Sequence, residues 1–250
     1  MKKLAFILSL LFLVWRSFAA QERISTSKHD VIKVTLDWQH QIVVSAVDNG
    51  SQAKTVKQLM DDVWWMTAIN WAFFCPNESA YSRCDPNTSD FMRIMDWNLY
   101  ATHWQDVWAW RTLIWFDYNW TPQAINRWWE SWINGQRITP WLSQIRYWLN
   151  MYTLIYQWSV QRLSPMNTDS KQSRADTKQF MCFTQDKQTV YFWAVYSIAF
   201  NRLWDYLKDT FNCYNAIQLD SGWSRAMIYN NTYIVWPWRR VMDAIVIVPS

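Results

Sequence analysis

Polar residues that could bind an anion gather in one short segment near the C-terminus. Asp220-Ser221-Gly222-Trp223-Ser224 follows Asn215–Leu219, a run whose composition predicts a β-strand. A turn rich in Gly and Ser after a strand can direct backbone N–H groups at an anion. The segment is such a turn if Trp223 is read as glycine, a reading that the composition of the whole chain favours.

Other chemistries lack their usual residue patterns. The three histidines, His29, His40 and His103, are scattered, and no H-E-x-x-H or similar ligand spacing occurs. No Gly-x-Ser-x-Gly nucleophile elbow occurs either. The sequence therefore indicates neither a metal site nor a cofactor.

Tryptophan is abundant in this chain and glycine is rare. There are 22 tryptophans and 3 glycines in 250 residues, whereas average usage would give roughly 17 glycines. Several tryptophans follow Asp or Asn, where Asp-Gly and Asn-Gly turns place a glycine at φ > 0: Asp37-Trp38, Asn70-Trp71, Asp96-Trp97 and Asn119-Trp120. We hypothesise that many are glycines in the living protein, encoded by UGA codons that its genome reads as Gly. A true Trp-rich protein of a membrane interface or a carbohydrate surface is the alternative.

The N-terminus has the features of an export signal. Lys2 and Lys3 precede the apolar run Leu4–Val14, which is too short to span a bilayer, and Ala19 suits signal peptidase. We expect a signal peptide at 1–19 and one exported domain at 20–250, located in the periplasm, in the cell envelope or outside the cell. No stable membrane span is expected after cleavage; a retained N-terminal anchor is the alternative.

The charge of the mature chain is nearly balanced. Three of the 24 Lys and Arg residues lie in the signal, so the mature chain has 21 Lys and Arg residues and 20 Asp and Glu residues. No basic block is present, and nucleic acid is therefore not an expected partner.

Four cysteines suit an oxidising compartment. Cys75 and Cys84 bracket a short polar loop and are candidates for a disulfide. Cys182 and Cys213 could pair only if the tertiary structure brings them together, and buried free thiols are the alternative.

Hydrophobic patterning predicts many strands and few helices. Helices are expected at Ala53–Asp62 and Tyr196–Phe211, and a hairpin through Asp37-Trp38 is expected to join Ile32–Leu36 to Gln41–Ala46. Further strands are expected at Met66–Asn70, Leu113–Phe116, Ile125–Asn126, Tyr152–Tyr156, Phe180–Thr184, Val190–Phe192, Asn215–Leu219, Ala226–Tyr229, Tyr233–Val235 and Ala244–Val248. We therefore expect an α+β fold: a single domain with a largely antiparallel or mixed sheet and a few packed helices.

With Trp read as Gly, three segments resemble those of the phosphodiester glycosidase family. Trp64–Phe74 resembles the family's Gly-Gly…Ala-Ile-Asn-Gly-Gly-Phe-Phe segment, and Asn215–Met227 resembles its Asn-Leu-Asp-Gly-Gly-Gly-Ser signature. Arg239–Ile245 looks like its closing Arg-Pro-Val-x-Asn-Ala segment. The order and rough spacing match over about residues 40 to 249. The chain departs from the family's Gly, Asn, Gly, Pro and Asn at Ala72, Gln218, Ser221, Arg240 and Asp243.

The resemblance implies an exported hydrolase that acts on a sugar phosphodiester or a related cell-envelope glycan linkage, without a cofactor. A non-catalytic envelope domain of the same fold that binds glycan is the alternative. The implied catalytic residues are Asp220, for acid–base work, and Asn70, which would bind a sugar hydroxyl or orient Asp220. The implied substrate-binding residues are Arg239, whose fork matches phosphate oxygens, Ser224, Ser221, Gly222 and Arg111.

Each assignment has a simpler alternative. Asp220 could cap its turn and Asn70 could be a buried turn residue, while Arg239 could be a surface residue. Arg174 and Lys178 compete with Arg111 for a place in the pocket. A second catalytic carboxylate is not selected by the sequence; the candidates by charge alone are Asp117, Glu78 and Glu130.

If these residues share one site, Asn70, Asp220 and Arg239 should lie together at the ends of neighbouring strands. Under the glycine hypothesis, Trp71 and Trp223 should crowd that site. Exposed turns are expected at Trp38, Trp97 and Trp120.

Overall fold

The computed structural model describes residues 21–36, 40–47, 52–71, 93–95, 98–100, 111–116, 121–126, 147–160 and 174–249. Within these residues strands dominate, and the α-helices are α2 (Val56–Asp61) and α5 (Phe200–Phe211). The strands form two sheets, and every pairing in them is antiparallel. The expected α+β class is therefore wrong. The two sheets bury one apolar cluster against each other, and a single helix covers the outer face of each sheet.

The larger sheet has eleven strands. Its main path runs β1 (Gln21–Ser25), β2 (His29–Thr35), β12 (Thr189–Ile198), β11 (Asp176–Phe183), β13 (Asn215–Leu219), β9 (Tyr147–Tyr156), β5 (Arg93–Met95) and β6 (Asn98–Tyr100). Three further strands join it through β9: β7 (Arg111–Phe116), β8 (Pro122–Asn126) and β10 (Ser159–Val160).

The smaller sheet has five strands, in the order β15 (Thr232–Val235), β14 (Met227–Tyr229), β4 (Thr67–Asn70), β16 (Asp243–Pro249) and β3 (His40–Ala46). The expected hairpin between β2 and β3 is wrong. β2 pairs with β1 and β12, whereas β3 pairs with β16 in the other sheet. Alternating side chains predict a strand but do not select its partner, and here long-range pairings select it.

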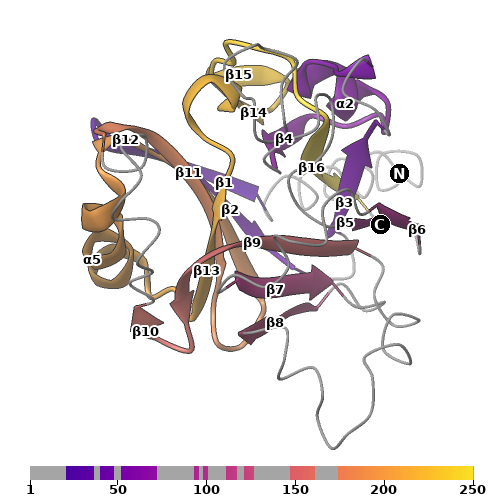
Figure 1. Cartoon of the computed structure of the whole chain (residues 1–250). Coiled ribbons are helices and arrows are strands. Elements are labelled where there is room, and N and C mark those ends of the chain that lie inside the picture. Colours follow the sequence, from indigo (N-terminus) through magenta and orange to yellow (C-terminus); the bar gives the residue numbers. More distant parts are fainter. Residues whose placement is uncertain are drawn as a thin grey trace, which may run out of the picture.

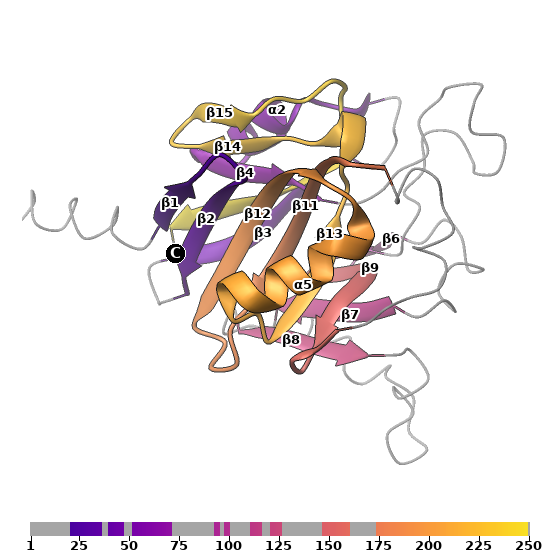
Figure 2. The same ribbon diagram turned by 90° about the vertical axis from the view of Figure 1, so that its left-hand side faces the viewer.

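The fold has four layers (Figures 1 and 2). Apolar side chains of both sheets, among them Met181, Ile217 and Ile245, form the core between them. α5 packs on the outer face of the larger sheet through Leu203, Trp204 and Leu207. α2 packs on the outer face of the smaller sheet through Val56, Leu59 and Met60.

Most other expected elements are confirmed, with shifted ends. α2 begins after Thr55, whose hydroxyl accepts a hydrogen bond from the Gln58 N–H in a capping box. α5 begins at Phe200 rather than Tyr196, because β12 continues to Ile198. β1, β5, β6 and β10 were not expected from the sequence.

A disulfide joins Cys182 on β11 to Cys213 after α5, with the Cα atoms 5.7 Å apart. The alternative of free thiols at these two positions is therefore wrong. Cys75 and Cys84 lie outside the described residues.

Trp64 occupies a position that favours glycine. It follows α2 at φ 60°, in the left-handed region that a bulky residue rarely adopts. The N–H of Trp65 donates to the Met60 carbonyl and that of Trp64 to the Asp61 carbonyl, which is the bonding pattern of a Schellman motif. The residue at φ > 0 in that motif is usually glycine, yet here it is a tryptophan that is 90% exposed.

Trp158 occupies a second such position. Gln157 and Trp158, at φ 47° and 67°, form the two-residue turn between β9 and β10. Asn230 and Asn231, at φ 47° and 65°, form a two-residue turn between β14 and β15. A hairpin turn with two positive φ angles favours Asn and Gly, so Asn230-Asn231 fits its turn and Gln157-Trp158 does not.

The remaining described tryptophans differ in environment. Trp193 and Trp204 are buried in the cluster under α5, and Trp71 is 1% exposed in the core between the sheets. Trp223, Trp236 and Trp238 are exposed. Trp71 and Trp223 are not at positive φ, and Trp38, Trp97 and Trp120 lie outside the described residues.

The expected signal peptide also lies outside the described residues. In the part of the chain that the structure describes, no helix is both long enough and apolar enough to cross a bilayer.

Candidate functional site

The Asp220 segment crosses from one sheet to the other. β13 ends at Leu219 in the larger sheet, Gly222–Ser224 form a short 3-10 turn, and β14 begins at Met227 in the smaller sheet. The Asp220 N–H donates to the Trp71 carbonyl over 2.8 Å. The segment 220–226, called the crossing loop below, is therefore tied to the end of β4 at its first residue.

Asn70 holds both ends of the crossing loop. Its side-chain Nδ2 donates to the Asp220 carbonyl over 2.9 Å, and its Oδ1 accepts from the Ala226 N–H over 2.8 Å. Asn70 is 1% exposed. Because both ends of the amide are engaged within the protein, this geometry supports an orienting role for Asn70 rather than a contact with a sugar hydroxyl.

Gln179 of β11 fixes the crossing loop from the larger sheet, and the sequence analysis missed it. Its N–H donates to Ser221 Oγ over 2.8 Å, and its side-chain amide both donates to the Ala226 carbonyl and accepts from the Ala226 N–H. Its exposed fraction is zero. Gln179 follows the polar residues Asp176, Thr177 and Lys178 in β11, so no local sequence pattern distinguishes it.

The carboxyl group of Asp220 is buried with one oxygen unsatisfied. Oδ1 accepts from the Ser221 N–H over 2.8 Å, whereas Oδ2 has no hydrogen-bond partner among the described residues. Burial raises the pKa of Asp220 to about 7; the Ser224 hydroxyl, the Arg239 charge and the Ser221 N–H act in the opposite direction, and the charge of Asp243 adds to the rise. A carboxyl group with such a pKa can give up and take back a proton near neutral pH.

Arg239 lies beside the same loop. Its Nε donates to Ser224 Oγ over 2.7 Å, and the neighbouring Trp238 N–H donates to the Trp223 carbonyl over 3.1 Å. The structure thus brings Asn70, Asp220, Ser221, Ser224 and Arg239 together, all within or against the crossing loop.

Gly222 and Arg225 form another side of the loop. Gly222 has φ 63°, and a Cβ atom built on it would lie 3.7 Å from Asp176 Oδ2. Arg225 Nη1 donates to Asp176 Oδ1 over 3.0 Å. A partly exposed ion pair therefore flanks the loop on the side of β11.

Arg111 is placed only through its backbone. It opens β7 opposite Tyr152 of β9, and β9 pairs with β13. Its backbone is thus two strands from β13, or about 10 Å. Asp117, Glu78, Glu130 and His103 lie outside the described residues; Arg174 is exposed and Lys178 is buried.

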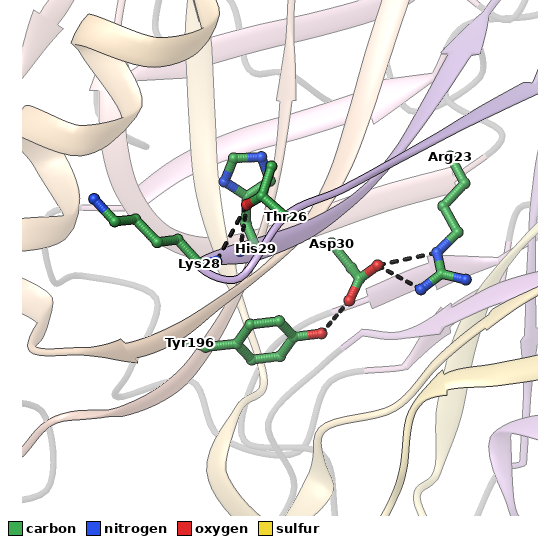
Figure 3. A network of polar contacts seen from close by, with 6 residues as sticks. All are labelled: Arg23, Thr26, Lys28, His29, Asp30 and Tyr196. Atoms are coloured by element: carbon green, nitrogen blue, oxygen red, sulfur yellow. Dashed lines mark hydrogen bonds and ion pairs between the residues drawn. The ribbon is translucent and has the colours of Figure 1, made fainter.

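A second polar cluster lies at the β1–β2–β12 edge (Figure 3). Asp30 accepts from Arg23 Nε and Nη2 over 3.0 and 2.7 Å and from the Tyr196 hydroxyl. Burial would raise the pKa of Asp30, but the hydrogen bonds from Tyr196, Arg23 and Ser25 and the Arg23 charge lower it below its ordinary value. The charge of Arg225 reaches Tyr196, so this cluster adjoins the crossing loop. Among the described residues, no group of three or more His, Cys, Asp or Glu side chains could hold a metal ion.

Comparisons with known proteins reveal the fold but not the family. No family model matches the sequence, and no curated protein matches it. Among solved structures, the catalytic domain of zebrafish N-acetylglucosamine-1-phosphodiester alpha-N-acetylglucosaminidase, auto-inhibited by its pro-peptide, is similar with a TM-score of 0.63 at 11% identity, over 90% of this chain and 80% of that chain.

Two further structures are similar at the same level. A hypothetical protein from Synechocystis has a TM-score of 0.61 at 10% identity, over 92% of this chain and 61% of its own. A protein from Burkholderia pseudomallei that is named as exported has a TM-score of 0.59 at 9% identity, over 88% of this chain and 74% of its own. The chain therefore has a fold distantly similar to that of a phosphodiester glycosidase catalytic domain.

Proposed function

We propose that this protein is an exported hydrolase that cleaves a glycosyl phosphodiester or a related cell-envelope glycan linkage, with its active site at the crossing loop. The observation that carries the proposal is the buried carboxyl of Asp220, whose Oδ2 has no hydrogen-bond partner among the described residues and whose pKa is raised by burial to about 7. The fold similarity to a phosphodiester glycosidase catalytic domain supports the substrate class.

The chemistry needs a proton donor and a group that recognises phosphate. Hydrolysis breaks the bond between the sugar carbon and the phosphate oxygen; water adds its hydroxyl to the sugar, and a proton goes to the departing oxygen. Asp220 can supply that proton, because its carboxyl remains protonated up to about pH 7. The Arg239 guanidinium, placed by Ser224, supplies positive charge for the phosphate.

Access to Asp220 depends on the tryptophans around it. Asp220 is 4% exposed, and Trp71, whose carbonyl accepts its N–H, fills part of the core between the sheets. Trp223 stands within the crossing loop. If residues 71 and 223 are glycines in the living protein, two indole rings are absent from the surroundings of Asp220, and a sugar phosphate could approach it.

The proposal is tested with the protein in two forms, one with the printed tryptophans and one with glycine at every UGA codon. Each is incubated with a panel of sugar-1-phosphodiesters, and released sugar is measured. Activity should fall on the order of a hundredfold or more in Asp220→Asn, while Asp209→Asn on the surface of α5 should leave it unchanged. Full activity in Asp220→Asn would assign Asp220 to the turn alone.

A non-catalytic envelope domain that binds glycan is the second candidate, and the deep burial of Asp220 favours it for the chain as printed. Calorimetry with the same panel separates the two. Binding without release of sugar in both forms would support the binding domain.

A further inference from the structure

Two tryptophan rings protrude together beside the crossing loop. Trp236 and Trp238 follow β15 and are 70% and 71% exposed. Tryptophan is highly buried on average, so two that protrude this far, two positions apart, form an uncommon apolar surface. Neither residue is at positive φ. The backbone at these two positions therefore does not favour glycine, in contrast to that at Trp64 and Trp158.

Neighbouring groups hold the backbone and one of the rings in place. The Trp236 ring stacks on the Tyr233 ring, with the centroids 4.8 Å apart, and the Tyr233 hydroxyl accepts from the Lys57 N–H of α2 over 3.2 Å. The Trp238 N–H donates to the Trp223 carbonyl over 3.1 Å, which ties the segment to the crossing loop. Trp223 is not counted in this surface, because we expect glycine at that position.

The charge around the two rings is positive. Residues 221–242 contain three arginines and neither Asp nor Glu: Arg225, Arg239 and Arg240. Arg240 is exposed, and its Nη1 lies 3.5 Å from the Ala53 carbonyl. The acidic side chains of the neighbouring α2 segment, Asp61 and Asp62, are each paired with a lysine. The Arg240 charge therefore remains available to an anion at this surface.

We propose that Trp236, Trp238 and Arg240 form a surface, called the aromatic edge below, that docks on a membrane rich in anionic phospholipid. Indole rings prefer the headgroup level of a bilayer, and basic residues beside them are attracted to anionic lipid. Because the aromatic edge is bonded to the crossing loop, docking holds that loop near the membrane surface. This property goes beyond the proposed function and does not depend on hydrolysis.

A soluble glycan is a less suitable occupant of the aromatic edge. Sugar hydroxyls that leave water need hydrogen-bond partners on the protein. The segment Val235–Arg240 carries no side chain with an amide, a hydroxyl or a carboxyl group. Insertion of indole rings among lipid headgroups needs no such partners, because water and phosphate remain beside the rings.

The test is co-sedimentation of the full chain, made with the residues that its genome encodes, with lipid vesicles. The parent should bind vesicles of phosphatidylglycerol and phosphatidylethanolamine more tightly than vesicles of phosphatidylcholine alone, and added salt should weaken the binding. Replacing Trp236 and Trp238 together by alanine should weaken binding on the order of tenfold or more. Arg240→Gln should weaken binding to the anionic vesicles about fivefold.

Trp158→Ala is the matched control. Trp158 is also partly exposed, but it lies in the β9–β10 turn of the larger sheet, so its loss should leave vesicle binding unchanged. The aromatic edge is exposed, and its substitutions should therefore leave the fold intact; thermal unfolding checks this.

Three results would overturn the inference. The first is that the parent binds neither kind of vesicle, or binds only a soluble phosphate-bearing glycan polymer. The second is equal binding by the parent and the double alanine variant at Trp236 and Trp238. The third is UGA at both of these codons, because the aromatic edge would then be absent from the living protein.

Discussion

The Asn70 side chain donates to the main-chain oxygen of Asp220 over 2.9 Å, and its other end accepts from the N–H at the far end of the same loop. A residue of the smaller sheet thereby fixes the main chain at Asp220, which follows a strand of the larger sheet. The loop between the sheets is thus held in place before any substrate arrives, as a preorganised site requires.

Removing this clamp should destabilise the protein. Asn70→Ala leaves the Asp220 carbonyl without its side-chain donor in a buried region, and should lower the free energy of unfolding by about 1–3 kcal/mol. Urea denaturation gives the value. Gln185→Ala, in the exposed turn after β11, is the control and should be nearly neutral; equal losses in both variants would show that Asn70 does not fix the loop.

Asp220 should limit stability at high pH. The unfolded carboxyl releases its proton near pH 3.8 and the native one near pH 7, so between these values the native state binds more protons. The free energy of unfolding therefore falls as the pH rises through this window. Asp220→Asn avoids the buried charge and keeps an acceptor for the Ser221 N–H.

This variant should be more stable than the parent above pH 7, by up to a few kcal/mol, while the two should converge near pH 4. Thermal unfolding across pH 4–9 makes the comparison. If the variant is less stable than the parent at pH 8, the folded protein stabilises the charged form of Asp220, and the expectation is wrong.

Glycine should be favoured at two of the printed tryptophans. Trp64→Gly and Trp158→Gly relieve left-handed conformations that cost about 1–2 kcal/mol each for a non-glycine residue. The gain should be clearer at Trp64, since Trp158 also contacts the Tyr214 ring. Trp193→Gly is the control: Trp193 is buried against Phe180, and its loss should cost about 3–5 kcal/mol.

The codons in the genome offer an independent test of the hypothesis that some of these tryptophans are glycines. We expect UGA at Trp64, Trp158 and Trp223. UGG at all three would show that the tryptophans belong to the protein, and losses of stability in both Trp64→Gly and Trp158→Gly would argue the same.

The Cys182–Cys213 bond closes a span of 31 residues that includes α5. Replacing both cysteines with alanine should lower the free energy of unfolding by about 3–4 kcal/mol, and the parent should show the same loss after reduction. Denaturation with and without a thiol reductant is the measurement. Identical curves for the parent with and without reductant would contradict a closed bond in the folded protein.

The sequence predicted local structure better than the arrangement of that structure. Asn215–Leu219 was predicted with the observed ends, because its apolar run stops at a polar turn. The pairing of β2 and β3 with different sheets was not predictable, since both are short runs rich in Val and Ile and their partners lie far along the chain. The fold class was wrong for the same reason: a list of strands does not reveal that they divide into two stacked sheets.

The residues of the candidate site that belong to a recognisable motif were predicted from the sequence. The residues that reach the site only through the packing of strands were not. Asp220, Asn70 and Arg239 were named from segments that resemble a known family, and the structure brings them together. Gln179 acts on the crossing loop from β11. Its position depends on strand register, which no local pattern contains.

The central claim is that the crossing loop hydrolyses a sugar phosphodiester through Asp220. Its most direct test is the rate of sugar release from a sugar-1-phosphodiester by the glycine-restored chain and by the same chain carrying Asp220→Asn. The account predicts release by the first and a loss on the order of a hundredfold or more in the second. No release from any member of the panel, or equal release by both chains, would contradict it.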